Sequence, residues 1–391
     1  MSHQNIAILG ATGNIAEEFA KQIAQKDVPR LGRHENPTNI IAMADRSGII
    51  LNTGGIEIQN DPELIAELQG TDRKLAEQGQ PRTAFKNWLR AQPGYQDGAQ
   101  LKDLFDQVVQ QGLIDDVVFV DLTASDLTSF HQQIIEAGGK IVTANKIPVA
   151  QSSWEVFKLL TRLRRRYAFS CSVMAGAGAV PFLQKCFDLQ DKVISIEGCF
   201  SGTLGKLCNL LYKGEITFSE AIRQLKVGGD TEPDPRDDLS GMDVARKIVV
   251  LARAAGYPVD LKDATVKPFI PDGFGELAQS KCSTEEFMAE CSKFDGKMSD
   301  TFREARDKGK TLRYVATLKL EGEKPKLTVG LREEELDSSL GSLKGNANKV
   351  VIFTDTNRNV PWELSAAGSG IRDTAKNVRG DLRDIQTSIA A

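Results

Sequence analysis

The sequence predicts an α/β protein in which a parallel-sheet domain at the N-terminus is followed by an α+β domain. Residues 5–24 have the pattern of a strand, a glycine turn and a helix. Apolar strand patterns recur at 39–44, 116–122 and 140–143, with helical patterns between them. Alternating strand patterns gather again in 312–354. Strands that alternate with helices predict parallel βαβ units, whereas a run of strands predicts an α+β arrangement.

Composition limits the class of protein. The chain has 391 residues, more than one hydrophobic core usually serves, so two or three domains are expected. Its net charge of −4 favours neither nucleic acid nor an anionic membrane as a partner. No apolar run reaches the roughly 18 residues of a spanning helix, and the N-terminus lacks the features of a signal peptide. A cytoplasmic protein is therefore expected.

The cysteines and histidines of the sequence indicate which kinds of site the protein could have. The six cysteines form no CxxC pair and no Cys/His cluster, so we expect reduced thiols. The three histidines are not at ligand spacing from one another, which argues against a histidine-based zinc site. His131, on a helix expected at 126–138, is predicted to lie at the surface. Proton transfer in an enzyme of this composition would have to use Lys, Asp or Glu side chains.

The glycine turn after the first strand is typical of a dinucleotide-binding site. Gly10 allows a tight turn, and Gly13 lets backbone N–H groups approach a pyrophosphate at the helix N-terminus. The spacing is GxxGxxA rather than GxGxxG, so the motif alone is weak. Its position between a strand and a helix favours a Rossmann-type fold. The candidate cofactor-binding residues in this turn are Gly10, Thr12, Gly13, Asn14 and Ile15.

Polar residues follow the later strands, where open parallel sheets bind their ligands. Asp45 would accept a hydrogen bond from the ribose 2′-hydroxyl of NAD, whereas Arg46 could hold the 2′-phosphate of NADP. The sequence therefore does not decide between NAD and NADP as the cofactor. Lys146 is a candidate for the nicotinamide region, with a solvated lysine as the alternative. The candidate cofactor-binding residues after the strands at 116–122 and 140–143 are Thr123, Ala124, Ser125, Thr143 and Lys146.

The densest group of charges lies between Thr231 and Lys247, in the sequence TEPDPRDDLSGMDVARK. Its two prolines predict a stiff acidic loop. Ser240 and Asp243 predict a capping box at the start of an apolar helix. Asp243 and Lys247 then share one helix face. Such a pair is often a solvated helix face, but the apolar run after it and the carboxylates before it favour a functional site.

Together these motifs resemble the homoserine dehydrogenase family over essentially the whole chain. The segment from Thr231 to Lys247 is the most specific match. That family reduces L-aspartate 4-semialdehyde to L-homoserine with NADPH or NADH, as a dimer. The resemblance implies an amino-acid substrate, NADP or NAD as cofactor, and a homodimer. Further matches are Thr143-Ala144-Asn145-Lys146, Ile196-Glu197-Gly198 with Ser201-Gly202-Thr203, and Gly368-Ser369-Gly370 with Thr374-Ala375 and Val378.

The resemblance also implies domain boundaries and residue roles. It implies an NAD(P)-binding Rossmann-like domain over 1–149, a catalytic and dimerisation domain over 150–362, and a segment over 363–391 that returns to the first domain. Lys247 takes the family's acid/base position, and Lys146 is its second catalytic lysine. Gly368 and Gly370 join the cofactor-binding residues. The implied substrate-binding residues are Gly229, Glu232, Asp237, Asp238, Asp243 and Thr203.

The chain departs from the family pattern at several positions. Ser172 stands where many members have the glutamate of a monovalent-cation site, so no metal-binding residue is predicted. Gly205-Lys206 replaces an Asn-Tyr or Ser-Tyr pair. A related oxidoreductase acting on another small semialdehyde or amino acid therefore stays open. A non-catalytic nucleotide-binding protein would be expected to lack one of four residues that are all present here, namely Lys146, Lys247, Glu232 and Asp243.

The absence of an aspartokinase segment before Gly10 predicts a monofunctional enzyme, or the dehydrogenase half of a longer one. An organelle stroma would replace the cytoplasm as the expected compartment if a transit peptide belonged upstream of this sequence. A strand is also predicted at 169–174, before a second glycine turn.

Overall fold

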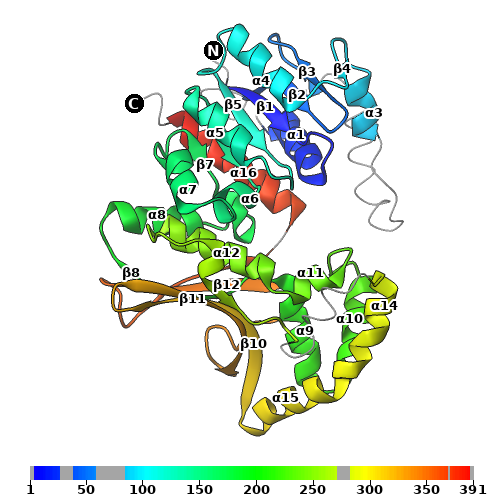
Figure 1. Cartoon of the computed structure of the whole chain (residues 1–391), viewed down its shortest axis with the longest axis vertical. Helices are drawn as coiled ribbons and strands as arrows, with labels where there is room; N and C mark the ends of the chain where they lie inside the picture. The colour runs from blue at the N-terminus through cyan, green and yellow to red at the C-terminus, as the bar shows by residue number, and fades with distance from the viewer. Residues whose placement is uncertain (1–3, 27–37, 59–83, 271–281, 369, 388–391) are drawn as a thin grey trace. The chain divides into compact units, whose positions relative to one another are not determined.

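The computed structural model describes residues 4–26, 38–58, 84–270, 282–368 and 370–387. The chain divides into two compact units, residues 1–172 with 370–391, and residues 173–369. The first is an α/β unit built from both ends of the chain, and the second is an α+β unit built from its middle (Figure 1). This arrangement confirms the predicted fold class.

The first unit contains a seven-stranded sheet in the order β4-β3-β2-β1-β5-β6-β7. Strands from β2 to β7 in this order are parallel, and β3 and β4 add an antiparallel edge. The order reverses at β1, so the carboxyl ends of β1 and β5 lie at the switch point where such sheets bind ligands. The strands are β1 (Gln4–Leu9), β2 (Thr38–Ala44), β3 (Gly48–Leu51), β4 (Gln96–Asp97), β5 (Val117–Asp121), β6 (Lys140–Thr143) and β7 (Tyr167–Ala168).

The C-terminal helix α16 (Ile371–Thr387) packs into the core of the first unit. Its residues Ala375, Val378 and Leu382 recur at helical spacing and are buried in one cluster with Ile8 of β1 and Phe19 of α1. The C-terminal helix therefore returns to the first unit, as predicted, whereas residues 363–367 of the predicted returning segment belong to the sheet of the second unit. The described helices here are α1 (Asn14–Lys26), α3 (Ala84–Arg90), α4 (Leu101–Gln110), α5 (Thr128–Glu136), α6 (Ile147–Ala150), α7 (Trp154–Thr161) and α16.

The first unit extends to residue 172, whereas the predicted division placed a boundary after 149. The predicted strand at 169–174 is wrong. The chain instead forms two 3₁₀ turns, Ser170–Ser172 and Met174–Gly176. The backbone N–H of Ser170 donates to Asp381 Oδ2 of α16 at 3.1 Å, and its hydroxyl bonds to the other carboxylate oxygen. This N–H is therefore not available to a neighbouring strand.

The second unit contains a six-stranded sheet in the order β13-β12-β8-β10-β11-β9. Only the pairing of β11 with β9 is parallel among these described strands. β13 was not among the predicted strands. The strands are β8 (Val193–Cys199), β9 (Ala264–Val266), β10 (Lys310–Glu321), β11 (Lys324–Glu335), β12 (Ala347–Thr354) and β13 (Trp362–Ala367).

The apolar helix α12 (Met242–Ala254) is the most buried helix near the acidic loop, with ten buried residues. The predicted capping box at its start is wrong, because Gly241 is the N-cap and has φ +73°. A Cβ at Gly241 would lie 1.8 Å from the Tyr314 hydroxyl oxygen, so β10 leaves room only for glycine. The other described helices are α8 (Ala179–Asp188), α9 (Gly202–Lys213), α10 (Phe218–Val227), α11 (Pro235–Leu239), α14 (Thr284–Glu290) and α15 (Asp295–Asp307), with 3₁₀ turns at Leu261–Asp263 and Cys291–Phe294.

None of the helices in the described ranges has the length and apolar character needed to cross a membrane.

Candidate active site

The glycine turn of the first unit leads directly into the N-terminus of α1. Gly10 has φ +78°, and a Cβ there would lie 2.9 Å from Thr123 Cγ2. The N–H of Gly13 donates to the Gly10 carbonyl at 2.9 Å, which closes the turn. Gly13 and Asn14 are exposed, and Ile15 is half-buried. The turn therefore presents the positive end of the α1 dipole to solvent without a side chain at Gly10 or Gly13, as a pyrophosphate site requires.

Asp45 organises the turn after β2. Its Oδ1 accepts from the backbone N–H groups of Ser47 at 2.7 Å and Gly48 at 3.1 Å. Its Oδ2 accepts from the Thr12 hydroxyl at 3.3 Å, which joins two of the predicted cofactor residues. Arg46 beside it is exposed. A carboxylate and a guanidinium thus both occur at the predicted ribose-binding position, which does not decide between NAD and NADP.

Asp121 is buried at the carboxyl end of β5 and joins the loops that follow β5 and β6. Its Oδ1 accepts from the Thr123 backbone N–H at 2.9 Å and hydroxyl at 2.7 Å. Its Oδ2 accepts from Asn145 Nδ2 at 3.0 Å, and Asn145 also donates to the Ser125 carbonyl at 2.8 Å. The Thr143 hydroxyl donates to the Asp121 carbonyl at 3.3 Å. Asp121 and Asn145 were missed as site residues, although an acid that ends a buried strand is a recognisable signal.

His131 belongs to the same buried group, so its predicted surface position is wrong. It is 0% exposed, with Nε2 3.0 Å from Asp121 Oδ2 and Nδ1 2.9 Å from the Tyr167 hydroxyl. Burial, and then the negative charge of Asp121, raise the pKa of Tyr167. The helix pattern of residues 126–138 could not reveal this, because Tyr167 arrives on β7 from a distant part of the chain.

The remaining predicted cofactor residues fall on both units. Lys146 caps the short helix α6 after β6 and is half-buried, and Ala124 is exposed. Gly370 begins the described C-terminal segment of the first unit, where its carbonyl accepts from the Thr374 N–H at 2.9 Å. Gly368 belongs to the second unit. A Cβ there would lie 1.9 Å from Asn348 Nδ2, so the close approach to β12 requires glycine.

Side-chain hydrogen bonds organise the acidic loop of the second unit before α11. Asp234 is the N-cap of α11 and Pro235 its first residue. Asp234 Oδ1 accepts from the Arg236 backbone N–H at 3.0 Å, and the Arg236 guanidinium binds both carboxylate oxygens. Hydrogen bonding from Arg236 lowers the pKa of Asp234. These bonds hold Asp234 and Arg236 together at the start of α11, and the stiffness of the loop stays a prediction.

Asp238 joins several of the predicted substrate-binding residues. Its Oδ2 accepts from the Glu232 backbone N–H at 2.8 Å. Burial raises the pKa of Asp238 to about 6, hydrogen bonds from Glu232 and Thr203 oppose this rise, and the charges of Glu232 and Asp243 add to it. Asp237 is exposed and makes no hydrogen bond or ion pair with this group in the part of the chain that the structure describes.

Lys247 carries a buried ammonium group at the first turns of α12. The residue is 8% exposed, which rules out the solvated helix face. Its Nζ lies 2.7 Å from Asp243 Oδ2 and donates to the Phe200 carbonyl at 2.6 Å. Phe200 directly follows β8, so the sheet and α12 together position this amine. A buried amine with two oxygen partners beside carboxylates is suited to proton transfer.

A second ion pair beside this group was missed by the sequence analysis. Lys206 of α9 binds Asp230 Oδ1 through its ammonium group. The Asp230 carbonyl accepts from the Thr203 hydroxyl at 2.6 Å. Asp230 follows Gly229, which has φ +71° and comes directly after Gly228, the C-cap of α10. The replacement of a tyrosine by Lys206 was visible in the sequence, but its partner was not.

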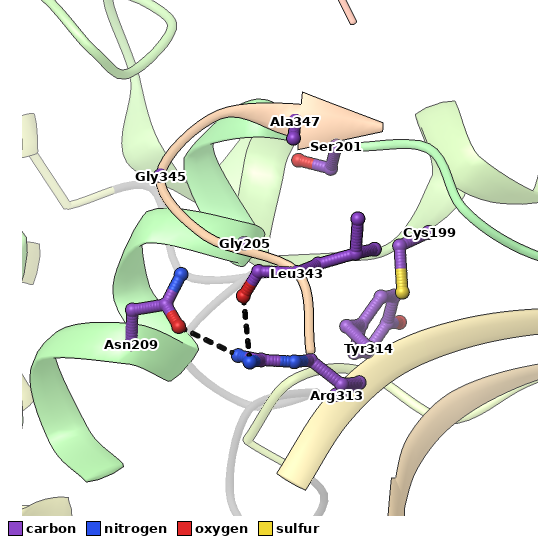
Figure 2. Close-up of a pocket in the computed structure, with 9 residues that line it drawn as sticks. All are labelled: Cys199, Ser201, Gly205, Asn209, Arg313, Tyr314, Leu343, Gly345 and Ala347. Carbon is purple, nitrogen blue, oxygen red and sulfur yellow. Dashed lines mark hydrogen bonds between the residues drawn. The ribbon is translucent and has the colours of Figure 1, made fainter. Parts of the chain in front are cut away.

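A separate small cavity lies next to the N-terminal half of α9 (Figure 2). Its volume is about 10 Å³, which suits one water molecule rather than an amino acid. Arg313 lies beside it and bonds to Asn209 Oδ1 at 2.9 Å and to the Leu343 carbonyl at 2.7 Å, as the dashed lines in Figure 2 show. These bonds give Arg313 a structural role, and none of the residues that line the cavity is a predicted site residue.

Ser172, at the position of the family's cation ligand, is buried and donates from its hydroxyl to the Phe169 carbonyl at 2.6 Å. Within the described ranges, no group of three or more His, Cys, Asp or Glu side chains is arranged to hold a metal ion. The absence of metal-binding residues stays a prediction.

The chain is similar to known homoserine dehydrogenases. The model of the family described as homoserine dehydrogenase matches residues 181–382. A homoserine dehydrogenase of Emericella nidulans is 34% identical over 68% of this chain and 74% of its own length. A homoserine dehydrogenase of Schizosaccharomyces pombe is 29% identical over 99% of this chain and 96% of its own.

Longer relatives and solved structures also match. A chloroplastic bifunctional aspartokinase/homoserine dehydrogenase of Daucus carota is 31% identical over 78% of this chain, and the chain spans about a third (33%) of that relative's length. A hyperthermophilic archaeal homoserine dehydrogenase solved in complex with NADPH has a TM-score of 0.67 and 21% identity, over 99% of this chain and 98% of that one. At this identity the structural likeness shows the fold alone.

Proposed function

The chain belongs to the homoserine dehydrogenase family, and on that premise we propose that it catalyses the reversible NAD(P)-dependent reduction of L-aspartate 4-semialdehyde to L-homoserine. The observation that carries this proposal is the buried Lys247 ammonium, held by Asp243 and the Phe200 carbonyl. Glu232 and Asp238 belong to the same acidic group. One lysine among carboxylates suits an amino-acid substrate whose oxygen gains or loses a proton.

The first unit would bind the dinucleotide, and its residues fit one. The glycine turn keeps the N-terminus of α1 open to a pyrophosphate, and the turn at Asp45 and Arg46 offers partners for the ribose or its phosphate. The bound nicotinamide would supply or accept the hydride. The residues of the first unit proposed for this role are Gly10, Thr12, Gly13, Asn14, Ile15, Asp45, Arg46, Thr123, Ala124, Ser125, Thr143, Lys146 and Gly370, and Gly368 of the second unit is proposed with them.

The second unit would bind the amino acid. The substrate's ammonium group would lie against the carboxylates of Glu232, Asp238 and Asp243, because charge-assisted hydrogen bonds to carboxylates are the strongest available partners for it. Thr203 and the backbone at Gly229 would add neutral contacts, and Asp237 would contribute charge from the loop. Lys247 is buried, Asp238 is half-buried and Glu232 is exposed, so this group combines a buried amine with carboxylates that a substrate could reach.

Lys247 would act as the general acid and base. During reduction a hydride bonds to the aldehyde carbon, the C=O π electrons move to the oxygen, and the Lys247 ammonium donates a proton to that oxygen. In oxidation the neutral amine removes the same proton. Asp243 and the Phe200 carbonyl orient the amine. Lys146 would be the second catalytic lysine, whose positive charge stabilises negative charge on the reacting oxygen.

The family membership also supports a biological setting. We propose a homodimer that works in threonine, methionine and isoleucine biosynthesis. The composition, with no predicted membrane span, supports the cytoplasm as the compartment, or an organelle stroma.

The direct test is to measure reduced nicotinamide formation from L-homoserine with NAD and with NADP. L-serine, which is one methylene shorter, and L-threonine serve as competing hydroxy amino acids. We expect homoserine to be oxidised much faster than either with at least one cofactor. Failure to oxidise homoserine with both cofactors, or a preference for another hydroxy amino acid, would refute the proposal.

A further inference from the structure

The Lys206–Asp230 ion pair places a positive charge next to the predicted substrate-binding residues. Thr203 and Lys206 are three residues apart on α9, so they lie on the same face of that helix. Asp230 contacts both of them, through its carbonyl to the Thr203 hydroxyl and through its carboxylate to the Lys206 ammonium. Asp230 therefore holds the ammonium group of Lys206 on the same side of α9 as the hydroxyl of Thr203.

Thr203 in turn connects this pair to the acidic group. Hydrogen bonding from Thr203 and from the Glu232 N–H lowers the pKa of Asp238, against the larger opposing effect of burial. Glu232 is only two residues beyond Asp230 on the loop after α10. Lys206 is thus linked through Asp230 and Thr203 to Asp238, one of the carboxylates that would hold the ammonium group of an amino acid.

An amino-acid substrate also carries a carboxylate, and this acidic group would repel it unless a cation lay nearby. Two other cations of the region are already held by protein oxygens. Arg236 binds both oxygens of Asp234, and Lys247 is buried between Asp243 and the Phe200 carbonyl. Lys206 has three N–H donors, of which Asp230 takes one, and its side chain is 29% exposed. It can therefore bind an incoming carboxylate without leaving Asp230.

We propose that Lys206, oriented by Asp230, binds the α-carboxylate of the amino-acid substrate and makes the enzyme select α-amino acids over amino alcohols. This inference rests on the proposed function, because it assigns a further residue to the same substrate site. Asp230 is a positioning residue in this arrangement. A tyrosine at position 206 could offer one neutral hydroxyl but no charge.

The test compares Lys206→Met and Lys206→Arg with Lys213→Met, which removes an exposed lysine at the end of the same helix. Two alcohols are used, L-homoserine and 3-aminopropan-1-ol, which has the same ammonium and alcohol but no carboxylate. Binding of homoserine is measured by calorimetry, alongside kcat and KM with the preferred cofactor.

Loss of a hydrogen bond to a charged group should weaken homoserine binding and raise its KM roughly 10- to 100-fold in Lys206→Met. The KM for cofactor and the kcat/KM for 3-aminopropan-1-ol should stay near the wild-type values, and Lys206→Arg should recover part of the loss. Lys213→Met should match the wild type.

Unchanged homoserine binding in Lys206→Met would overturn the inference. An equal loss for both alcohols would also overturn it, because a structural role of Lys206 would weaken both alike. These outcomes differ from failure of the proposed function, which would appear as a wild-type enzyme that does not oxidise homoserine.

Discussion

Asp243 and Lys247 lie one turn apart on α12, and the carboxylate Oδ2 of Asp243 is 2.7 Å from the ammonium nitrogen of Lys247. The same ammonium donates to the carbonyl of Phe200 at 2.6 Å, and the lysine is 8% exposed. An exposed ion pair at this spacing stabilises a helix by only about 0.3–0.5 kcal/mol. The buried position of Lys247 indicates a functional role, because removing an ammonium group from water lowers the stability of the folded protein.

Replacing Lys247 should remove proton transfer while leaving cofactor binding intact. Methionine has a similar length and no charge, so Lys247→Met limits the cavity that alanine would leave. We expect kcat for homoserine oxidation to fall roughly 10²- to 10⁴-fold, the usual contribution of a general acid or base. NADPH binding, measured by fluorescence, should not change. Wild-type turnover in this variant would contradict the assignment of Lys247, with Lys213→Met as the control.

Asp238 should impose a pH dependence on substrate capture. Burial raises its pKa to about 6, so the carboxylate becomes neutral below that pH and attracts the substrate's ammonium less strongly. We expect kcat/KM for homoserine to fall, by up to about tenfold per pH unit, as the pH drops below 6. Asp238→Asn should lower kcat/KM at pH 8 and remove this limb. The exposed variant Asp300→Asn should keep the wild-type profile, and an unchanged acid limb in Asp238→Asn would argue against the assignment.

Arg46 should distinguish the two cofactors. Its exposed guanidinium beside Asp45 could pair with the 2′-phosphate that only NADP carries. We expect Arg46→Ala to lower kcat/KM for NADP about 10-fold or more, and that for NAD less than about twofold. Arg303→Ala, at an exposed arginine of α15, is the matched control. Equal losses with both cofactors would contradict the phosphate role.

Asp381 should make the stability of the first unit depend on pH. Burial raises the pKa of Asp381 to about 7, although the hydrogen bonds from Ser170 oppose this rise, so the folded state holds a proton that the unfolded chain releases near its ordinary pKa. Because the folded state then binds more protons, the stability from this group is present below about pH 4 and is lost as the pH rises to 7.

The test for Asp381 is thermal unfolding between pH 4 and 8. Asp381→Asn keeps a carbonyl acceptor for the Ser170 N–H and an amide for its hydroxyl, but it cannot ionise. We expect the variant to flatten the decline in Tm and to be more stable than the wild type at pH 8, on the order of one to a few kcal/mol. Asp373→Asn, at an exposed site on the same helix, should leave the decline in place. A steeper decline in Asp381→Asn would show that the buried carboxylate stabilises the fold.

The features that the sequence predicted well are those set by neighbouring residues. The glycine turn at Gly10, the helix that carries Asp243 and Lys247, and the proline-containing loop at Asp234 all depend on backbone preferences or helical spacing within a few residues. The residues within one or two turns determine such features, so a short stretch of sequence is enough to predict them.

The errors fall where a distant segment changes the local preference. The predicted strand at 169–174 became two 3₁₀ turns because Asp381 of α16 takes the Ser170 N–H. The predicted capping box was replaced by Gly241, whose backbone lies against Tyr314 of β10. In each case the competing contact comes from the far end of the chain or of the unit, and no local window contains it.

The sequence by itself determined which residues could bind the cofactor and substrate and transfer the proton. The acidic loop, the two lysines and the glycine turn can all be identified from residue type and spacing. Only the tertiary structure decided which of them are buried and paired. It placed His131 and Asn145 against Asp121, gave Lys206 its partner Asp230, and held Lys247 against the Phe200 carbonyl. The physical reason is that desolvation and ion pairing depend on distances through space, which spacing along the chain does not specify.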